Sequence, residues 1–167
     1  MSTNPSYLQT PMDAQVRNYR DWGIALGRRF RALKVWVTLR EQGAAAIRAR
    51  LRRDLANAQW LAAQVDATAP WRRIAPVTLQ TVCVRHEPPG LGADALDAHT
   101  RRWAQAINES GAACLTPAVV DGRWMVRVSI GIEATEARHV AELWQAMCAA
   151  AAASALAAAP ALPAAGT

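Results

Sequence analysis

The hydrophobic and polar positions along the first third of the chain predict an arm followed by two helices. Residues 1–26 contain several turn formers and no sustained period, so we expect an extended arm. From Gly27, apolar residues recur at helical spacing as far as residue 42, and Gly43 can cap that helix. A second, amphipathic helix is predicted over residues 44–65. Its apolar face carries Ile47, Leu51, Leu55 and Leu61.

After Pro70 the pattern first becomes that of strands and then returns to that of a helix. Residues 77–84 are rich in β-branched side chains and stop at the sequence His86-Glu87-Pro88-Pro89-Gly90, which predicts a strand or two ending in a loop. A third helix is predicted next and closes at Ser110-Gly111. It is marked by Leu96, Thr100, Trp103 and Ile107.

A hairpin and a last helix complete the pattern. Asp121-Gly122 lies between apolar runs at 115–120 and 123–132, and this residue pair suits the two positive φ angles of a type I′ turn. One face of the outgoing strand is expected to be buried, with Trp124, Val126, Val128, Ile130 and Ile132; the other carries Met125, Arg127, Ser129 and Gly131. The last helix, over residues 135–157, should direct Val140, Leu143, Trp144 and Met147 inward.

The order of these elements predicts an α+β fold, in which helices cover a small, mainly antiparallel sheet. We expect an arm at 1–26, two linking helices at 27–66, a small α+β domain at 67–157 and a disordered tail at 158–167. The length of 167 residues, 52% of them apolar, is enough for one such core.

The charge of the chain is unevenly distributed. Residues 1–53 carry 11 basic and 3 acidic groups, whereas residues 54–167 carry 8 basic and 10 acidic groups. Three arginines, Arg28, Arg29 and Arg31, lie where a helix begins, although cations are normally favoured at the opposite end. A solvated basic face, a nucleic-acid surface and a binding site for an anionic group all fit this pattern.

The remaining chemistry-bearing residues form no recognisable catalytic pattern. Three widely spaced cysteines, with no C-x-x-C pair, predict neither disulfides nor a zinc site. His86, His99 and His139 are far apart in the sequence, so we expect surface or boundary histidines and no metal site. The polar N-terminus and the short alanine-rich apolar run predict no signal peptide and no membrane span, hence a cytoplasmic protein.

The arginine-rich stretch also carries a family resemblance. Asn18–Trp22, Leu26–Lys34 and Trp36 resemble the D-Y-R-x-W-x-I-P-L-G-R-R-F-R-[AS]-L-K-x-W segment of the group II pyridoxal-phosphate-dependent amino-acid decarboxylases, in the aromatic-L-amino-acid branch. Ala25 stands where the family usually has proline, and Asn18 where it has aspartate. Val82–Arg85 and Trp124–Val128 resemble later strands, so the likeness extends over about residues 3–148.

The resemblance implies roles for three residues. Asn4–Leu8 is similar to the family's mobile catalytic loop, and Tyr7 then corresponds to the tyrosine implicated in protonating the carbanion left when CO₂ departs. Arg20 and Arg28 match arginines close to the cofactor pocket, where they would contact acidic groups or the substrate carboxylate. The fold implied is the small C-terminal domain of the fold-type I architecture.

The resemblance also implies that a part of the enzyme is missing from this chain. Pyridoxal phosphate requires a lysine that binds it covalently, and the family's lysine lies upstream in a large domain. The single lysine here, Lys34, matches a structural position. We therefore expect a C-terminal fragment or split half of an aromatic-L-amino-acid decarboxylase. It would be inactive alone and would join a cofactor-binding large domain or a dimer partner.

Two other functions stay open from the sequence. The first is a non-catalytic dimerisation or interaction protein derived from the small domain. The second is a basic nucleic-acid-binding module, against which the single lysine and the core spacing of most tryptophans argue.

Overall fold

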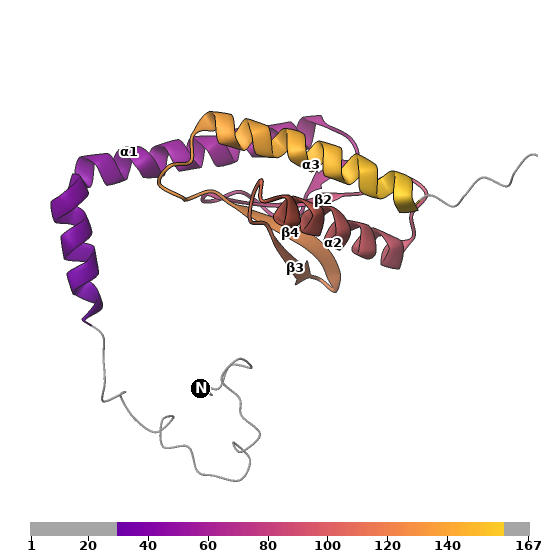
Figure 1. Ribbon diagram of the computed structural model, residues 1–167, viewed down its shortest axis with the longest axis horizontal. Coiled ribbons are helices and arrows are strands. Elements are labelled where there is room, and N and C mark those ends of the chain that lie inside the picture. The colour runs from indigo at the N-terminus through magenta and orange to yellow at the C-terminus, as the bar shows by residue number, and fades with distance from the viewer. Residues whose placement is uncertain (1–29, 159–167) are drawn as a thin grey trace, which may run out of the picture. The chain divides into compact units, whose positions relative to one another are not determined.

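The computed structural model describes residues 30–158, with helices and strands interleaved along the chain (Figure 1). The elements are α1 (Arg31–Ala67), β1 (Trp71–Arg73), β2 (Thr81–His86), α2 (Ala93–Ser110), β3 (Thr116–Val120), β4 (Arg123–Ser129) and α3 (Ala137–Ala158). The predicted α+β class is confirmed. The arm predicted over residues 1–26 and residues 159–167 of the predicted tail lie outside the described residues.

Helix α1 is interrupted at Gly43, where the sequence predicts that one helix ends and another begins. Gly43 has φ 76° and ψ 148°, which is not a helical conformation. Residues other than glycine rarely adopt this positive φ. No atom lies within 4 Å of the position that a Cβ would occupy, so the constraint at Gly43 comes from its backbone alone.

The sheet has four antiparallel strands in the order β1-β2-β4-β3. Strand β2 pairs with β4 so that Val82 is opposite Val128 and Val84 is opposite Val126. The predicted strand over residues 77–84 is wrong for 77–80, which lie outside β2, with bends at 78–80. There the Val77 carbonyl accepts a hydrogen bond from the Gln59 side chain of α1. Strand β1 is a three-residue edge strand with no alternating pattern to reveal it.

The predicted type I′ turn between β3 and β4 is confirmed. Asp121 has φ 51° and Gly122 has φ 73°, so both turn residues adopt the left-handed conformation that this hairpin requires. Val119 and Val120 lie opposite Trp124 and Arg123, which fixes the register of the hairpin up to the turn.

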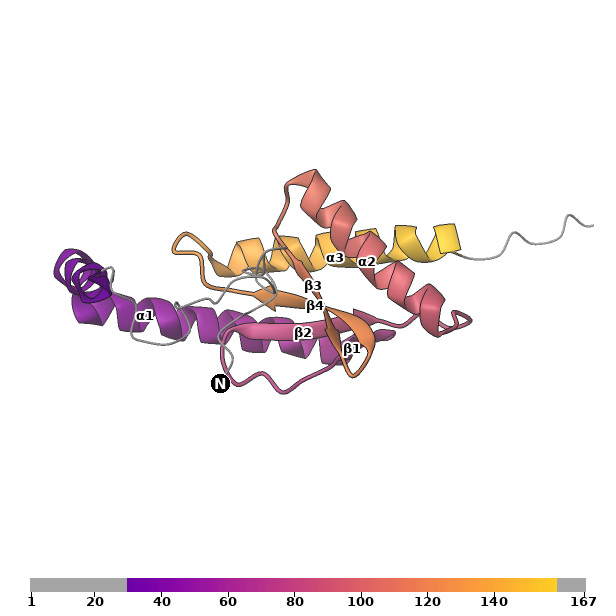
Figure 2. The ribbon, with the colours of Figure 1, turned by 90° about the horizontal axis from the view of Figure 1, so that it is seen from below.

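One face of the sheet, which we call the inner face, forms a core with all three helices. Its strand residues are Val82 and Val84 of β2 and Val126 and Val128 of β4. The helices contribute Ala58, Leu61, Ala62 and Val65 of α1, Trp103, Ala104 and Ile107 of α2, and Val140, Met147 and Ala151 of α3. Figure 2 shows α2 crossing α3 on one side of the sheet.

Three expectations about the core are wrong. Ile132 is 74% exposed, because β4 ends at Ser129 and the alternation does not continue. Met125 is buried although it lies on the face opposite to the inner one. Leu51 is exposed, and the buried side of α1 includes Asp54 and Asn57 beside small alanines.

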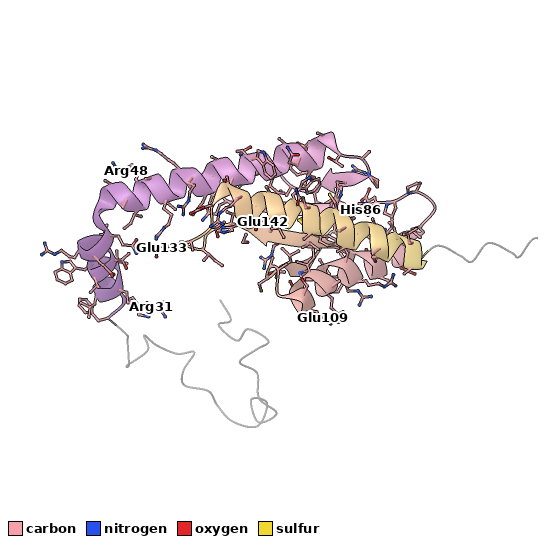
Figure 3. The ribbon with its side chains drawn as sticks, turned by 45° about the horizontal axis from the view of Figure 1, so that its top comes forward. Arg31, Arg48, His86, Glu109, Glu133 and Glu142 are labelled. Atoms are coloured by element: carbon pink, nitrogen blue, oxygen red, sulfur yellow. The ribbon has the colours of Figure 1, made fainter. Side chains whose placement is uncertain are left out.

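The second part of α1 is attached to the loop that precedes α3. The Arg53 guanidinium donates a hydrogen bond to the Glu133 carbonyl oxygen at 2.7 Å, and the Arg50 guanidinium lies 3.7 Å from the Glu133 carboxylate. Figure 3 shows Glu133 on this loop, near α1. Within residues 30–158, α3 is the one helix long and apolar enough to cross a membrane. Val140, Met147 and Ala151 of this helix lie in the core, which accounts for part of its apolar character.

Replacing Gly122 tests the turn. Gly122→Ala places a Cβ on a residue with φ 73° and is expected to lower the free energy of unfolding by about 1 kcal/mol. Gly131→Ala is the matched control, because Gly131 does not have a positive φ and a Cβ there would make only an ordinary contact, at 3.9 Å from Gln80 Nε2. Urea denaturation followed by circular dichroism measures both; an equal loss for the two variants would contradict the role of the turn.

Candidate functional site

The three residues to which the sequence assigns site roles, Tyr7, Arg20 and Arg28, lie outside the described residues. Their roles stay predictions. Of the arginine-rich stretch, the structure describes the part from Phe30 onward, including Arg31 and Lys34. The candidate site is therefore built from the surfaces that follow this stretch.

The first part of α1 exposes a row of large apolar side chains. We call residues 30–42 the exposed apolar helix. Its exposed side chains are Phe30, Leu33, Val35, Trp36, Val37 and Leu39, with exposed fractions between 45% and 74%. The Arg40 guanidinium lies over the Trp36 ring, 5.8 Å from its centroid. Several large apolar side chains exposed on one short helix are typical of a segment that contacts another protein surface.

The sheet presents a second surface, on the face opposite to the inner one. We call it the open face of the sheet, and it consists of the strand residues that alternate with the buried valines. Cys83 is opposite Arg127, and Thr81 is opposite Ser129. Arg127 and Ser129 are exposed, whereas Thr81 and Cys83 are half-buried. Hydroxyl and guanidinium groups on this face make it polar and basic.

Ion pairs order the part of the open face near β1. The Arg85 guanidinium donates to the Trp124 carbonyl oxygen at 2.9 Å and to the Glu87 carboxylate at 3.1 Å. The Arg72 guanidinium donates to the other oxygen of Glu87 at 3.3 Å. Glu87 thus joins two arginines from neighbouring strands.

Burial raises the pKa of the Cys83 thiol, while the positive charge of Arg127 opposes that rise. Cys83 is therefore a neutral thiol at pH 7.

Two of the histidines meet inside the fold, so the expectation of separate surface or boundary histidines is wrong for them. His86 Nδ1 lies 2.9 Å from His99 Nε2, and His99 Nδ1 lies 2.9 Å from Ser154 Oγ. Burial, followed by the neighbouring His99, lowers the pKa of His86 to about 4. The pKa of His99 is lowered by burial and then by Arg102, while a hydrogen bond with the Ser154 backbone acts in the opposite direction. We call His86, His99 and Ser154, joined by these hydrogen bonds, the histidine chain.

The periodicity of the sequence contains the signal for this pair. His86 continues the buried series of Val82 and Val84 on β2. His99 is one turn before Trp103 on the buried side of α2. The distance between the two histidines in the sequence does not by itself predict the contact between their rings. By contrast, His139 is half-buried at the start of α3, where its Nδ1 accepts a hydrogen bond from the Glu136 backbone N–H.

The residues that the structure describes contain no group of three or more His, Cys, Asp or Glu side chains that could hold a metal ion. The cysteines Cys83, Cys114 and Cys148 are free thiols. Lys34 lies on the exposed apolar helix and is itself exposed. The exposed apolar helix and the open face of the sheet both suit contact with another protein surface.

Comparison with known proteins agrees with the resemblance seen in the sequence. The family model described as the pyridoxal-dependent decarboxylase conserved domain matches residues 1–87. Tyrosine decarboxylase 1 of Narcissus pseudonarcissus is 34% identical over 155 residues, which cover 88% of this chain and 30% of the relative. Phenylacetaldehyde synthase of a Rosa hybrid cultivar is 35% identical over 153 residues, which cover 86% of this chain and 30% of the relative.

The fold also has solved counterparts. The crystal structure of Catharanthus roseus tryptophan decarboxylase in complex with L-tryptophan superimposes with a TM-score of 0.68 at 28% identity. That alignment covers 92% of this chain and 32% of the other. The likeness therefore extends from the sequence motifs to the arrangement of helices and sheet.

The chain belongs to the pyridoxal-dependent decarboxylase family, as predicted. Members of this family depend on pyridoxal phosphate and are carboxy-lyases. This chain spans about 30% of the length of the curated relatives that it matches.

Substitution of two tryptophans tests the distinction between the exposed apolar helix and the core. Trp36 is 59% exposed, so Trp36→Ala is expected to change the free energy of unfolding by less than about 0.5 kcal/mol. Trp103 is fully buried, so Trp103→Ala is expected to cost about 3–5 kcal/mol. Urea denaturation measures both values. A large loss for Trp36→Ala would mean that this side chain is already packed within the isolated chain.

Proposed function

We propose that this chain is the C-terminal part of a pyridoxal-phosphate-dependent decarboxylase that acts on aromatic L-amino acids in the cytoplasm. The observation that carries the proposal is the combined match of residues 1–87 to the family and of most of the chain to about 30% of its relatives. The complete enzyme would remove the α-carboxylate of its substrate as CO₂.

The chain by itself does not fit the cofactor. Pyridoxal phosphate needs a lysine amine, a carboxylate at its ring nitrogen and donors for its phosphate, gathered in one enclosed site. The one lysine of the sequence is Lys34. It is exposed on the first part of α1, next to apolar side chains. We therefore infer that the cofactor-binding residues belong to the remainder of the enzyme.

Two surfaces support an association with that remainder. The exposed apolar helix leaves in water side chains such as Phe30 and Trp36, whose burial would stabilise a complex. The open face of the sheet offers Arg127 and polar hydroxyl groups, which suit an acidic or polar surface. The predicted partner is a cofactor-binding large domain or a homologous subunit in a dimer.

The predicted site residues take their roles in that complex. Tyr7 would donate a proton to the substrate carbon after CO₂ leaves, because a phenol can act as a general acid where a closed loop excludes water. Arg20 and Arg28 would bind acidic groups or the substrate carboxylate through paired N–H donors. Arg28, Arg29 and Arg31 would then face anionic groups instead of solvent.

A non-catalytic interaction protein derived from the small domain is the second candidate. The exposed apolar helix favours it equally, because that surface requires a partner but not a reaction. A basic nucleic-acid-binding module is the third. Salt-sensitive DNA binding that is lost on neutralising Arg28 and Arg29 would distinguish the third from the others.

Reconstitution tests the decarboxylase proposal. The purified chain, mixed with equimolar pyridoxal phosphate, is expected to bind no cofactor covalently and to release no CO₂ from tyrosine or tryptophan. Co-expression with the part of Narcissus pseudonarcissus tyrosine decarboxylase that this chain does not span, which the proposal places N-terminal to it, is expected to give a complex that releases CO₂ and the amine. Activity of the chain alone would contradict the proposal, and a complex without activity would favour the interaction protein.

Two variants of the reconstituted enzyme test the residue roles. Tyr7→Phe removes the phenolic proton and is expected to lower amine formation at least about tenfold, with cofactor content unchanged. Arg138→Lys is the control, since it keeps the charge at an exposed position of α3, away from the proposed partner surfaces. It should leave cofactor content and amine formation unchanged. Amine formation at the wild-type rate in Tyr7→Phe would exclude Tyr7 as the proton donor.

A further inference from the structure

The histidine chain joins three elements that are distant in the sequence. His86 is the last residue of β2, His99 lies on α2 and Ser154 lies near the end of α3. Their exposed fractions are 7%, 0% and 5%. Figure 3 shows His86 at the end of its strand, beside α3. The chain of hydrogen bonds thus fixes the C-terminal half of α3 to the sheet through α2.

Both hydrogen bonds form when the two rings are neutral. His86 Nδ1–H can donate to His99 Nε2 while His99 Nδ1–H donates to Ser154 Oγ; in the other arrangement the Ser154 hydroxyl and His99 Nε2–H are the donors. One added proton places a charge in the core. A second proton leaves two N–H groups facing each other across 2.9 Å, so the bond between the rings is lost.

Of the groups that act on His99, burial and Arg102 disfavour this charge, whereas a hydrogen bond with the Ser154 backbone favours it. Arg102 of α2 donates to the Ser154 carbonyl oxygen at 3.3 Å and adds a positive charge. From β1, the Trp71 ring lies 4.8 Å from the His86 ring. From α3, the Cys148 thiol forms a side-chain hydrogen bond with Trp71. Burial raises the pKa of this thiol, so the thiol is uncharged below pH 8. On β2, Arg85 points to the opposite face and pairs there with Glu87.

We propose that the histidine chain is an acid-sensitive latch that holds α3 against β2 and α2, and releases α3 when the two imidazoles become protonated. This goes beyond the proposed decarboxylase function and does not depend on it. The latch is closed at neutral pH, where both rings are uncharged.

The direction of the pH effect follows from the two states of His86. Its pKa is about 4 in the folded chain and 6.5 when unfolded, so the unfolded state binds more protons between these values. Stability is therefore fully present above pH 7 and decreases as the pH falls from about 6.5 toward 4. For His86 alone, the equilibrium constant for opening rises about 20-fold between pH 7 and pH 5.

Hydrogen exchange of the full chain tests the latch. Amides of α3 are expected to lose about 20-fold in protection between pH 7 and pH 5, after correction for the intrinsic pH dependence of exchange. The double variant His86→Leu/His99→Leu replaces the pair with apolar side chains and should lose this dependence. His139→Leu removes the histidine that is not part of the histidine chain, and this variant should keep the pH dependence of α3 protection. An undiminished pH dependence in the double variant would overturn the proposal.

Two further measurements keep the test decisive if the double variant does not fold. Ser154→Ala removes only the last hydrogen bond and is expected to lower α3 protection already at pH 7. NMR titration of the wild-type chain should show the ring signals of His86 still in the neutral form at pH 6, and the His99 pKa below its ordinary value. Titration of either ring at its ordinary midpoint, with α3 protection unchanged, would also overturn the latch.

Discussion

The burial of one face of a four-stranded sheet beneath three helices is the constraint on which the rest of this structure depends. Strand β2 alternates strictly, so every second side chain enters the core, and Val126 and Val128 of β4 lie opposite its buried valines. At the end of β2 that position is occupied by His86, which a core accepts only when its ring nitrogens are hydrogen-bonded. His99 and Ser154 meet that requirement, and the polar chain is therefore part of how the core is satisfied.

The same constraint decides which surfaces the chain leaves uncovered. All three helices contribute to the core on the inner face, so their apolar residues in α2, α3 and the second part of α1 are used there. The first part of α1 contributes no residue to this core, and its large apolar side chains are exposed. A chain that spans about 30% of its relatives would be expected to carry such surfaces, because a cut through a larger enzyme exposes former interior contacts.

Much of the fold could be predicted from local patterns. The Asp121-Gly122 turn, the end of α2 at Gly111 and the interruption at Gly43 follow from backbone conformations that few residues adopt. The buried positions of Val126, Val128 and Met147 follow from periodicity. Strand β1 could not be predicted, because its three residues are too few to show an alternating pattern. The start of β2 could not be predicted, because the loop at 77–80 is held by a tertiary contact with α1. The meeting of His86 and His99 depends on how β2 and α2 pack, which sequence separation does not reveal. The family motif predicted roles for Tyr7, Arg20 and Arg28, and these three residues lie outside the described part of the chain.

The position of Lys34 has a practical consequence. Because the sequence contains one lysine, its ε-amine is the single side-chain amine that acylating reagents can modify. That amine lies on the exposed apolar helix, the surface that a partner would cover. The rate of acylation at Lys34 therefore reports directly on the occupancy of this surface, so one peptide mass can follow assembly without any added label.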